Sequence, residues 1–146
     1  MTGSRFLLIR AVMKTQNISS QRILVVDDEP FVCDAVKMML TFDGHEVTTA
    51  GGGKEALEVF EPGKFDLVIT DFAMPSMRGD ELALAIKERV PKQPILMITA
   101  YAEMLETAGG KPSAVDCVIS KPFMLESLRE AITKALSSGP KQDALK

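Results

Sequence analysis

From Arg22 onward, short apolar runs alternate with longer stretches in which apolar residues recur at helical spacing. Three of the runs are nearly continuous, which is typical of strands covered on both faces of a sheet. Parallel strands need a crossover connection, and the helical stretches supply it. The pattern predicts an α/β fold with five strands, at residues 23–26, 46–49, 66–70, 95–99 and 115–119.

Four of the stretches between or after the strands carry an apolar stripe that a helix would turn toward the sheet. A weaker helix is predicted over residues 101–108, closed by Gly109 and Gly110. Together these elements form a doubly wound, five-stranded parallel sheet with helices on both faces. The four stripes are Val32, Val36, Met39 and Leu40; Ala56, Leu57 and Phe60; Leu82, Ala85 and Ile86; and Leu125, Leu128, Ile132 and Leu136.

The length of 146 residues suits one domain, and a content of 46% hydrophobic and 25% charged residues is that of a globular protein. We assign the domain to residues 21–137. Residues 1–20 and 138–146 lack the alternating pattern and are expected to be tails. No output domain is expected after Leu136, because the remaining mainly polar residues are too few to fold alone.

Charge and hydropathy exclude two classes of partner. A net charge of −3 gives no bulk attraction to nucleic acid phosphates, so direct DNA binding is disfavoured. The apolar run Phe6–Ile9 is interrupted by Arg10 and is too short for a signal peptide or a membrane span. Cys33 and Cys117 lie far apart and are interpreted as small buried hydrophobes in a reducing compartment. We therefore expect a cytoplasmic protein without a membrane partner.

The carboxyl ends of the predicted strands carry most of the candidate chemistry. Asp27, Asp28 and Glu29 follow the first strand, Asp71 follows the third, Thr99 ends the fourth and Ser120-Lys121 follow the fifth. Each group alone is an ordinary loop or helix-cap residue. In a parallel sheet, however, these ends share one edge, so the side chains should converge on one crevice.

Converging carboxylates repel each other and need a cation. Mg²⁺ suits hard oxygen ligands and shares its shell with phosphate oxygens, so we expect Asp28 and Asp71 to bind it, with Asp27 reaching it through water. One oxygen of Asp71 would remain free as a nucleophile for a phosphoryl group. Thr99 and Lys121 could then bind phosphoryl oxygens.

The chain from Arg22 to Leu136 resembles the receiver domain of response regulators in two-component signal transduction. The resemblance covers the central part of the chain and implies a flavodoxin-like strand order of 2-1-3-4-5. It is carried by four motifs in the family's order: Val25-Val26-Asp27-Asp28-Glu29; Asp71-Phe72-Ala73-Met74-Pro75 with Gly79; Thr99-Ala100; and Lys121-Pro122-Phe123.

The resemblance implies that Asp71 is the phosphoacceptor and that Thr99 and Lys121 bind the phosphoryl group. Mg²⁺ would be held by Asp27, Asp28, Asp71 and the backbone carbonyl of Ala73. The partners implied are a sensor histidine kinase or histidine phosphotransfer protein, and a downstream protein target. Such a domain catalyses only its own phosphorylation and dephosphorylation. The resemblance also predicts a cis peptide bond before Pro122.

Two positions depart from the family's common pattern. Many receivers carry a Tyr or Phe three residues before the lysine, where this chain has Val118. The only tyrosine, Tyr101, instead lies two residues after Thr99, at the rim of the expected site. Coupling through a moving aromatic ring at position 118 is therefore not expected.

Other functions of the same fold fit the sequence less well. A flavodoxin would need Gly-rich or hydroxyl-bearing residues where Asp27–Glu29 stand, because acids there repel a phosphate. Gly51–Lys54 fails the P-loop pattern, and a haloacid-dehalogenase-type phosphatase would need an acid at Ala73. A relay intermediate, a phosphate sink and a phosphorylation-independent interaction module remain as alternative roles.

Overall fold

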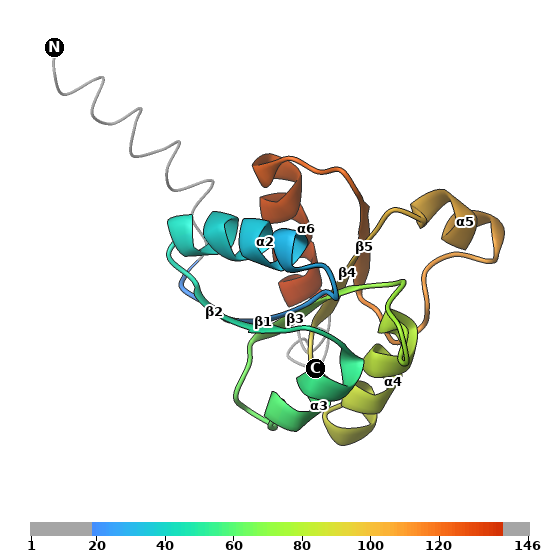
Figure 1. Ribbon diagram of the computed structural model, residues 1–146, viewed down its shortest axis with the longest axis horizontal. Helices are drawn as coiled ribbons and strands as arrows, with labels where there is room; N and C mark the ends of the chain where they lie inside the picture. Colours follow the sequence, from blue (N-terminus) through green and yellow to red (C-terminus); the bar gives the residue numbers. More distant parts are fainter. Residues whose placement is uncertain (1–18, 139–146) are drawn as a thin grey trace, which may run out of the picture.

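The computed structural model describes residues 19–138, which form one five-stranded parallel sheet with helices on both faces (Figure 1). The strand order is β2-β1-β3-β4-β5, which confirms the predicted order. The strands are β1 (Arg22–Val26), β2 (Glu46–Ala50), β3 (Leu67–Asp71), β4 (Ile95–Thr99) and β5 (Cys117–Ser120). The helices are α2 (Pro30–Phe42), α3 (Gly53–Val59), α4 (Gly79–Arg89), α5 (Ala102–Thr107) and α6 (Leu125–Ser137).

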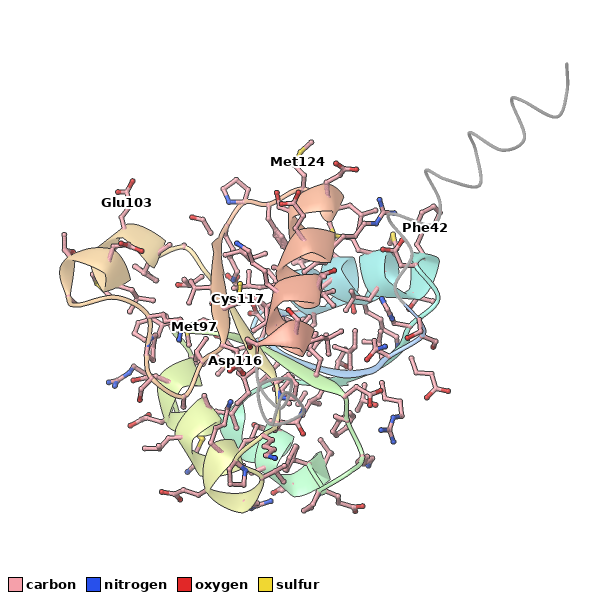
Figure 2. All side chains as sticks on the ribbon, turned by 180° about the vertical axis from the view of Figure 1, so that it is seen from behind. Phe42, Met97, Glu103, Asp116, Cys117 and Met124 are labelled. Carbon is pink, nitrogen blue, oxygen red and sulfur yellow. The ribbon has the colours of Figure 1, made fainter. Side chains whose placement is uncertain are left out.

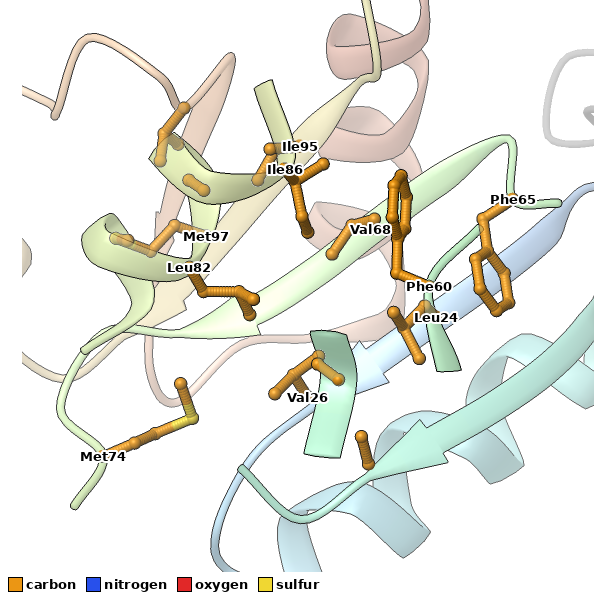
Figure 3. Packing of buried hydrophobic residues seen from close by; sticks show 14 of the residues in the cluster. Leu24, Val26, Phe60, Phe65, Val68, Met74, Leu82, Ile86, Ile95 and Met97 are labelled. Atoms are coloured by element: carbon orange, nitrogen blue, oxygen red, sulfur yellow. The ribbon is translucent and has the colours of Figure 1, made fainter. Parts of the chain in front are cut away.

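Alternate side chains of the central strands feed two separate cores, one on each face of the sheet. On one face, Leu24 and Val68 pack with Leu82 and Ile86 of α4, as Figure 3 shows. On the other face, buried side chains of β1, β3 and β4 pack against α2 and α6. This two-sided burial explains why the three central strands are almost continuously apolar.

Four strands differ from the predicted bounds: β1 begins one residue earlier, β2 ends one residue later, and β3 and β5 both begin and end later. Just before β3 and β5, an aspartate side chain bonds to the neighbouring strand. The third strand begins after Asp66, whose carboxylate accepts a hydrogen bond from the Arg22 backbone N–H at 2.7 Å. The fifth strand begins after Asp116, whose carboxylate accepts one from the Ile95 N–H at 2.8 Å and pairs with Lys87. The predicted strands 66–70 and 115–119 are therefore shifted toward the carboxyl end.

The chain just before β1 is tied to the turn after α2. The Gln21 N–H donates to His45 Nδ1 at 3.0 Å, and the Ser20 hydroxyl donates to the Gly44 carbonyl at 2.9 Å. His45 is buried, and burial lowers the pKa of its imidazole. It lies between this turn and β2 and holds the chain before β1 in place.

The predicted tails lie almost entirely outside the described residues, which include only Ser19, Ser20 and Ser138 of them. Within residues 19–138, no helix is both long and apolar enough to cross a membrane.

Gly79, at the start of α4, lies against the end of β3. Its N–H donates to the Phe72 carbonyl at 2.8 Å, and a Cβ placed on it would collide with the backbone carbonyl oxygen of Asp71. Only glycine allows this close approach of helix and strand. The position of α4 therefore depends on the absence of a Cβ atom at residue 79.

We expect Gly79→Ala to lower the free energy of unfolding by about 3 kcal/mol, because the obstacle is backbone that cannot rotate away. Gly51→Ala is the matched control, since a Cβ there meets nothing within 4 Å. The control should change stability by less than about 1 kcal/mol. Urea unfolding followed by circular dichroism measures both, and equal stabilities of the two variants would refute the packing argument.

Candidate functional site

Four strand ends place the predicted site residues at one edge of the sheet. Asp27 directly follows β1, and Asp71 is the last residue of β3. Thr99 is the last residue of β4, and Lys121 directly follows β5. The Lys121 N–H donates to the Thr99 carbonyl at 2.8 Å, which fixes the chain where it leaves the sheet. The Lys121-Pro122 peptide bond is cis, as predicted.

The Lys121 ammonium group lies between two buried carboxylates. Its Nζ atom is 3.1 Å from Asp27 Oδ2 and 3.3 Å from Asp71 Oδ1. Asp27 is 4% exposed and Asp71 is 8% exposed, so neither charge has much access to water. One cation thus bridges the ends of β1 and β3.

Backbone amides orient both carboxylates. The Glu29 N–H donates to Asp27 Oδ1 at 2.9 Å, and the Phe72 N–H donates to Asp71 Oδ1 at 2.8 Å. Each carboxylate therefore accepts a bond from the chain that follows it. The acids are held in place before any ligand arrives.

The charges at the site are not balanced. Burial raises the pKa of the Asp71 carboxyl above its usual range and the charge of Asp27 raises it further, whereas Lys121 opposes both effects. Burial by itself would lower the pKa of Lys121, but its hydrogen bond to Asp27 and the charge of Asp71 hold that pKa above its ordinary value. The site has an excess of negative charge that a further cation would relieve.

Carboxylate oxygens of Asp27, Asp28 and Asp71 lie within 4.8 Å of one another. Three hard oxygen donors at this spacing, with only one ammonium group beside them, fit a divalent cation such as Mg²⁺. A cavity of about 240 Å³ opens beside them and also has Ala73 and Lys121 in its wall. The donor set and the free space together fit a hydrated metal ion and a small anionic group.

Comparison with known proteins identifies the family of this site. The sequence profile of the response regulator receiver domain matches residues 23–133. This chain belongs to the receiver domain family. TcrA, a transcriptional regulatory protein of Mycobacterium tuberculosis, is 31% identical over 123 residues, which are 84% of this chain and 49% of TcrA. GlrR of Escherichia coli is 34% identical over 122 residues, 83% of this chain and 28% of GlrR.

Solved receiver structures share this fold over their whole length. CheY4 of Vibrio cholerae superposes with a TM-score of 0.72 at 32% identity, covering 81% of this chain and 100% of CheY4. TrrA of Thermotoga maritima, solved in complex with Mg²⁺ and BeF, has a TM-score of 0.68 at 38% identity, covering 80% and 99% of the two chains. The chain spans about half or less of the length of the curated relatives it matches.

In this receiver domain, Thr99 is held by the backbone that follows it. The Thr99 side chain is fully buried, and its Oγ1 atom accepts a hydrogen bond from the Tyr101 N–H at 2.9 Å. Its hydroxyl is therefore tied to the β4–α5 loop. Val118 is half-buried and packs against the core that includes α4. No aromatic ring stands at that position.

Sequence reasoning placed Tyr101 at the rim of the site but missed its contact with Phe72. The rings of Phe72 and Tyr101 meet edge to face with centroids 6.4 Å apart, and the Arg78 guanidinium lies 5.8 Å from the Phe72 ring centroid. Phe72 comes directly after Asp71, and Tyr101 is 48% exposed. β3 and β4 are neighbours in the predicted strand order, and each is followed closely by an aromatic residue. That combination could have indicated the contact.

A second cavity, of about 520 Å³, lies next to the site and was also not predicted. Its wall is almost entirely apolar and reaches Lys121 at one end. Phe31, directly after Pro30, lies at the border of this cavity and is exposed. A phenylalanine in the first turn of a helix, next to the site, is the sequence feature that could have indicated the cavity. The lining residues are Phe31, Val32, Ala35, Val36, Met39, Ala100, Lys121, Pro122 and Phe123.

With metal removed by a chelator, Asp71→Asn should raise the free energy of unfolding at pH 7 by on the order of 1 kcal/mol. Because the pKa of Asp71 is raised in the folded state, ionising this carboxyl opposes folding. The stability that the protonated carboxyl contributes is lost as pH rises above the ordinary carboxyl range. The stability advantage of Asp71→Asn over wild type should disappear at pH values below that range, where the Asp71 carboxyl is protonated in both the folded and the unfolded state. Thermal unfolding at a series of pH values measures it.

Asp66→Asn is the matched control, because Arg22 holds the pKa of the Asp66 carboxyl below its usual range. Its replacement should destabilise the domain at pH 7. Adding Mg²⁺ should stabilise the wild type more than Asp71→Asn, since binding to the native state adds stability. A loss of stability in Asp71→Asn under chelation would contradict the charge imbalance.

Proposed function

We propose that Asp71 is the phosphoacceptor of this receiver domain, which residues 21–137 form. The observation that carries the proposal is the position of the Lys121 ammonium, within 3.3 Å of Asp71 and 3.1 Å of Asp27. A cation at this distance can pair with a phosphoryl oxygen once Asp71 carries one. The second Asp71 oxygen is the candidate nucleophile.

Phosphorylation forms one bond and breaks one. An Asp71 carboxylate oxygen attacks the phosphorus atom of a donor, and the bond from phosphorus to the donor's leaving group breaks with its electron pair. For a phosphohistidine donor, the leaving imidazole keeps that pair and takes up a proton. Hydrolysis of the aspartyl phosphate later releases inorganic phosphate and restores the carboxylate.

Residues Asp27, Asp28 and Asp71, with the backbone carbonyl of Ala73, are the proposed ligands of Mg²⁺. The bound ion would neutralise charge on the transferred phosphoryl group, which is the main requirement of phosphoryl transfer. Asp27 also keeps Lys121 beside the nucleophile through their hydrogen bond. The excess negative charge of the site supports this assignment.

Thr99 is proposed to bind a phosphoryl oxygen and so to report phosphorylation. Its hydroxyl now accepts from the Tyr101 N–H, so a new bond to the phosphoryl group would change how the β4–α5 loop is held. Gly109 and Gly110, both at positive φ, leave the far end of α5 free of side chains that resist movement. The segment from Thr99 to Gly110, which includes the β4–α5 loop and α5, is therefore the proposed switch.

The proposed phosphodonor is a sensor histidine kinase or a histidine phosphotransfer protein, in the cytoplasm, and the output is binding to a downstream protein. The intact Asp27, Asp71 and Lys121 favour this role over a phosphorylation-independent interaction module. A relay intermediate and a phosphate sink use the same chemistry. Phosphotransfer assays against the histidine kinases of the source organism would separate them.

Acetyl phosphate with Mg²⁺ should add one phosphoryl group to the wild-type chain, measured by intact-mass spectrometry. Asp71→Asn should remain unlabelled, because an amide is not a nucleophile toward phosphorus. Asp80→Asn is the matched control, because Asp80 is a partly exposed acid that pairs with Arg78 and is not one of the proposed site residues. It should be labelled like the wild type. Equal labelling of Asp71→Asn and wild type would show that another group accepts the phosphoryl.

A further inference from the structure

Helix α2 is apolar on both of its long faces. Cys33, Val36 and Leu40 are buried against the sheet. On the opposite side, the helix carries a second apolar row at spacings of four, three and four residues, which places its members on one face. A helix with two apolar faces is normally covered on both.

We define this outer row as the α2 stripe: Phe31, Ala35, Met38 and Phe42. The three large side chains are 88%, 71% and 78% exposed, respectively. Figure 2 shows Phe42 at the outer end of the helix, directed away from the sheet. Exposed apolar side chains in a continuous row indicate a surface that binds another apolar segment.

We propose that residues 6–13 of this same chain bind the α2 stripe. Seven of these eight residues are apolar, in the sequence Phe-Leu-Leu-Ile-Arg-Ala-Val-Met. They precede Ser19, the first residue that the structure describes. The contact would be intramolecular, between the N-terminal segment and the outer face of α2.

The attachment point of the segment favours this occupant. Ser20 and Gln21 are hydrogen-bonded to Gly44 and His45, which come two and three residues after Phe42, where the chain leaves α2. The first described residues therefore lie at one end of the stripe. Tethering at that point gives a local concentration of the millimolar order, which a separate partner does not have.

The length of the segment also fits. Residues 14–18 can span about 17 Å when extended, and the stripe from Phe42 to Phe31 is about 17 Å long. Residues 6–13 can therefore reach any part of the stripe. Val12 and Met13 would lie near Phe42, with the earlier residues toward Phe31.

Charge complements the apolar contact. Residues 1–18 contain Arg5, Arg10 and Lys14 and no acid. Asp34 lies three residues after Phe31 and four before Met38, on the flank of the stripe, and Glu29 precedes the helix. The basic side chains would thus meet acids rather than a uniformly positive surface, although Lys37 is also on α2.

Limited trypsin digestion of the full chain tests the contact, because trypsin cuts after Arg10 only when the segment is free. Met38→Asp should speed cleavage at Arg10 about tenfold, the change that corresponds to about 1.4 kcal/mol of lost binding free energy. Leu8→Asp should have a similar effect. Combining the two should add little further, because they remove the same contact.

Leu84→Asp is the matched control, since Leu84 is 55% exposed on α4, on the other face of the sheet. It should leave the cleavage rate unchanged, and circular dichroism should show all variants folded. Equal cleavage of wild type and Met38→Asp would overturn the proposal. Protection that rises with protein concentration would overturn it in favour of a second copy. Binding to anionic lipid vesicles, with no effect of Met38→Asp on cleavage, would overturn it in favour of a membrane.

Discussion

The site depends on a single ammonium group placed between two buried carboxylates. Asp27 and Asp71 lie at the ends of neighbouring strands, and Lys121, directly after β5, is the cation that pairs with both of them among residues 19–138. Two acids and one base leave an excess negative charge. Burial, together with the charge of Asp27, raises the pKa of Asp71, and the excess negative charge makes the site receptive to a divalent cation and then to a phosphoryl group.

The sheet order explains why these groups can meet. β3 lies at the centre of the sheet, with β1 and β2 on one side of it and β4 and β5 on the other. The chain changes direction of winding next to β1, so the loops after β1 and β3 separate and leave a crevice between them. Burial of the central strands on both faces keeps this edge rigid. Gly79 lets α4 start directly against the end of β3.

Much of this arrangement could be predicted from the sequence, because the strands are continuous apolar runs and the acids follow them immediately. The strand limits at Asp66 and Asp116 could not, since each depends on a side chain that bonds to a distant backbone amide. The contact of Phe72 with Tyr101 likewise joins residues far apart in the chain. Such pairings follow from strand adjacency, which no local pattern contains.

The most direct test of the charge balance is the thermal stability of Lys121→Met with and without Mg²⁺. Lys87→Met is its control, because Lys87 is equally shielded but pairs with Asp116 away from the site. In chelator, Lys121→Met should lose about 2 kcal/mol of unfolding free energy, and Mg²⁺ should restore much of it. Lys87→Met should show no such restoration. If Lys121→Met is as stable as wild type in chelator, or if Mg²⁺ affects both variants alike, the ammonium does not hold the site together.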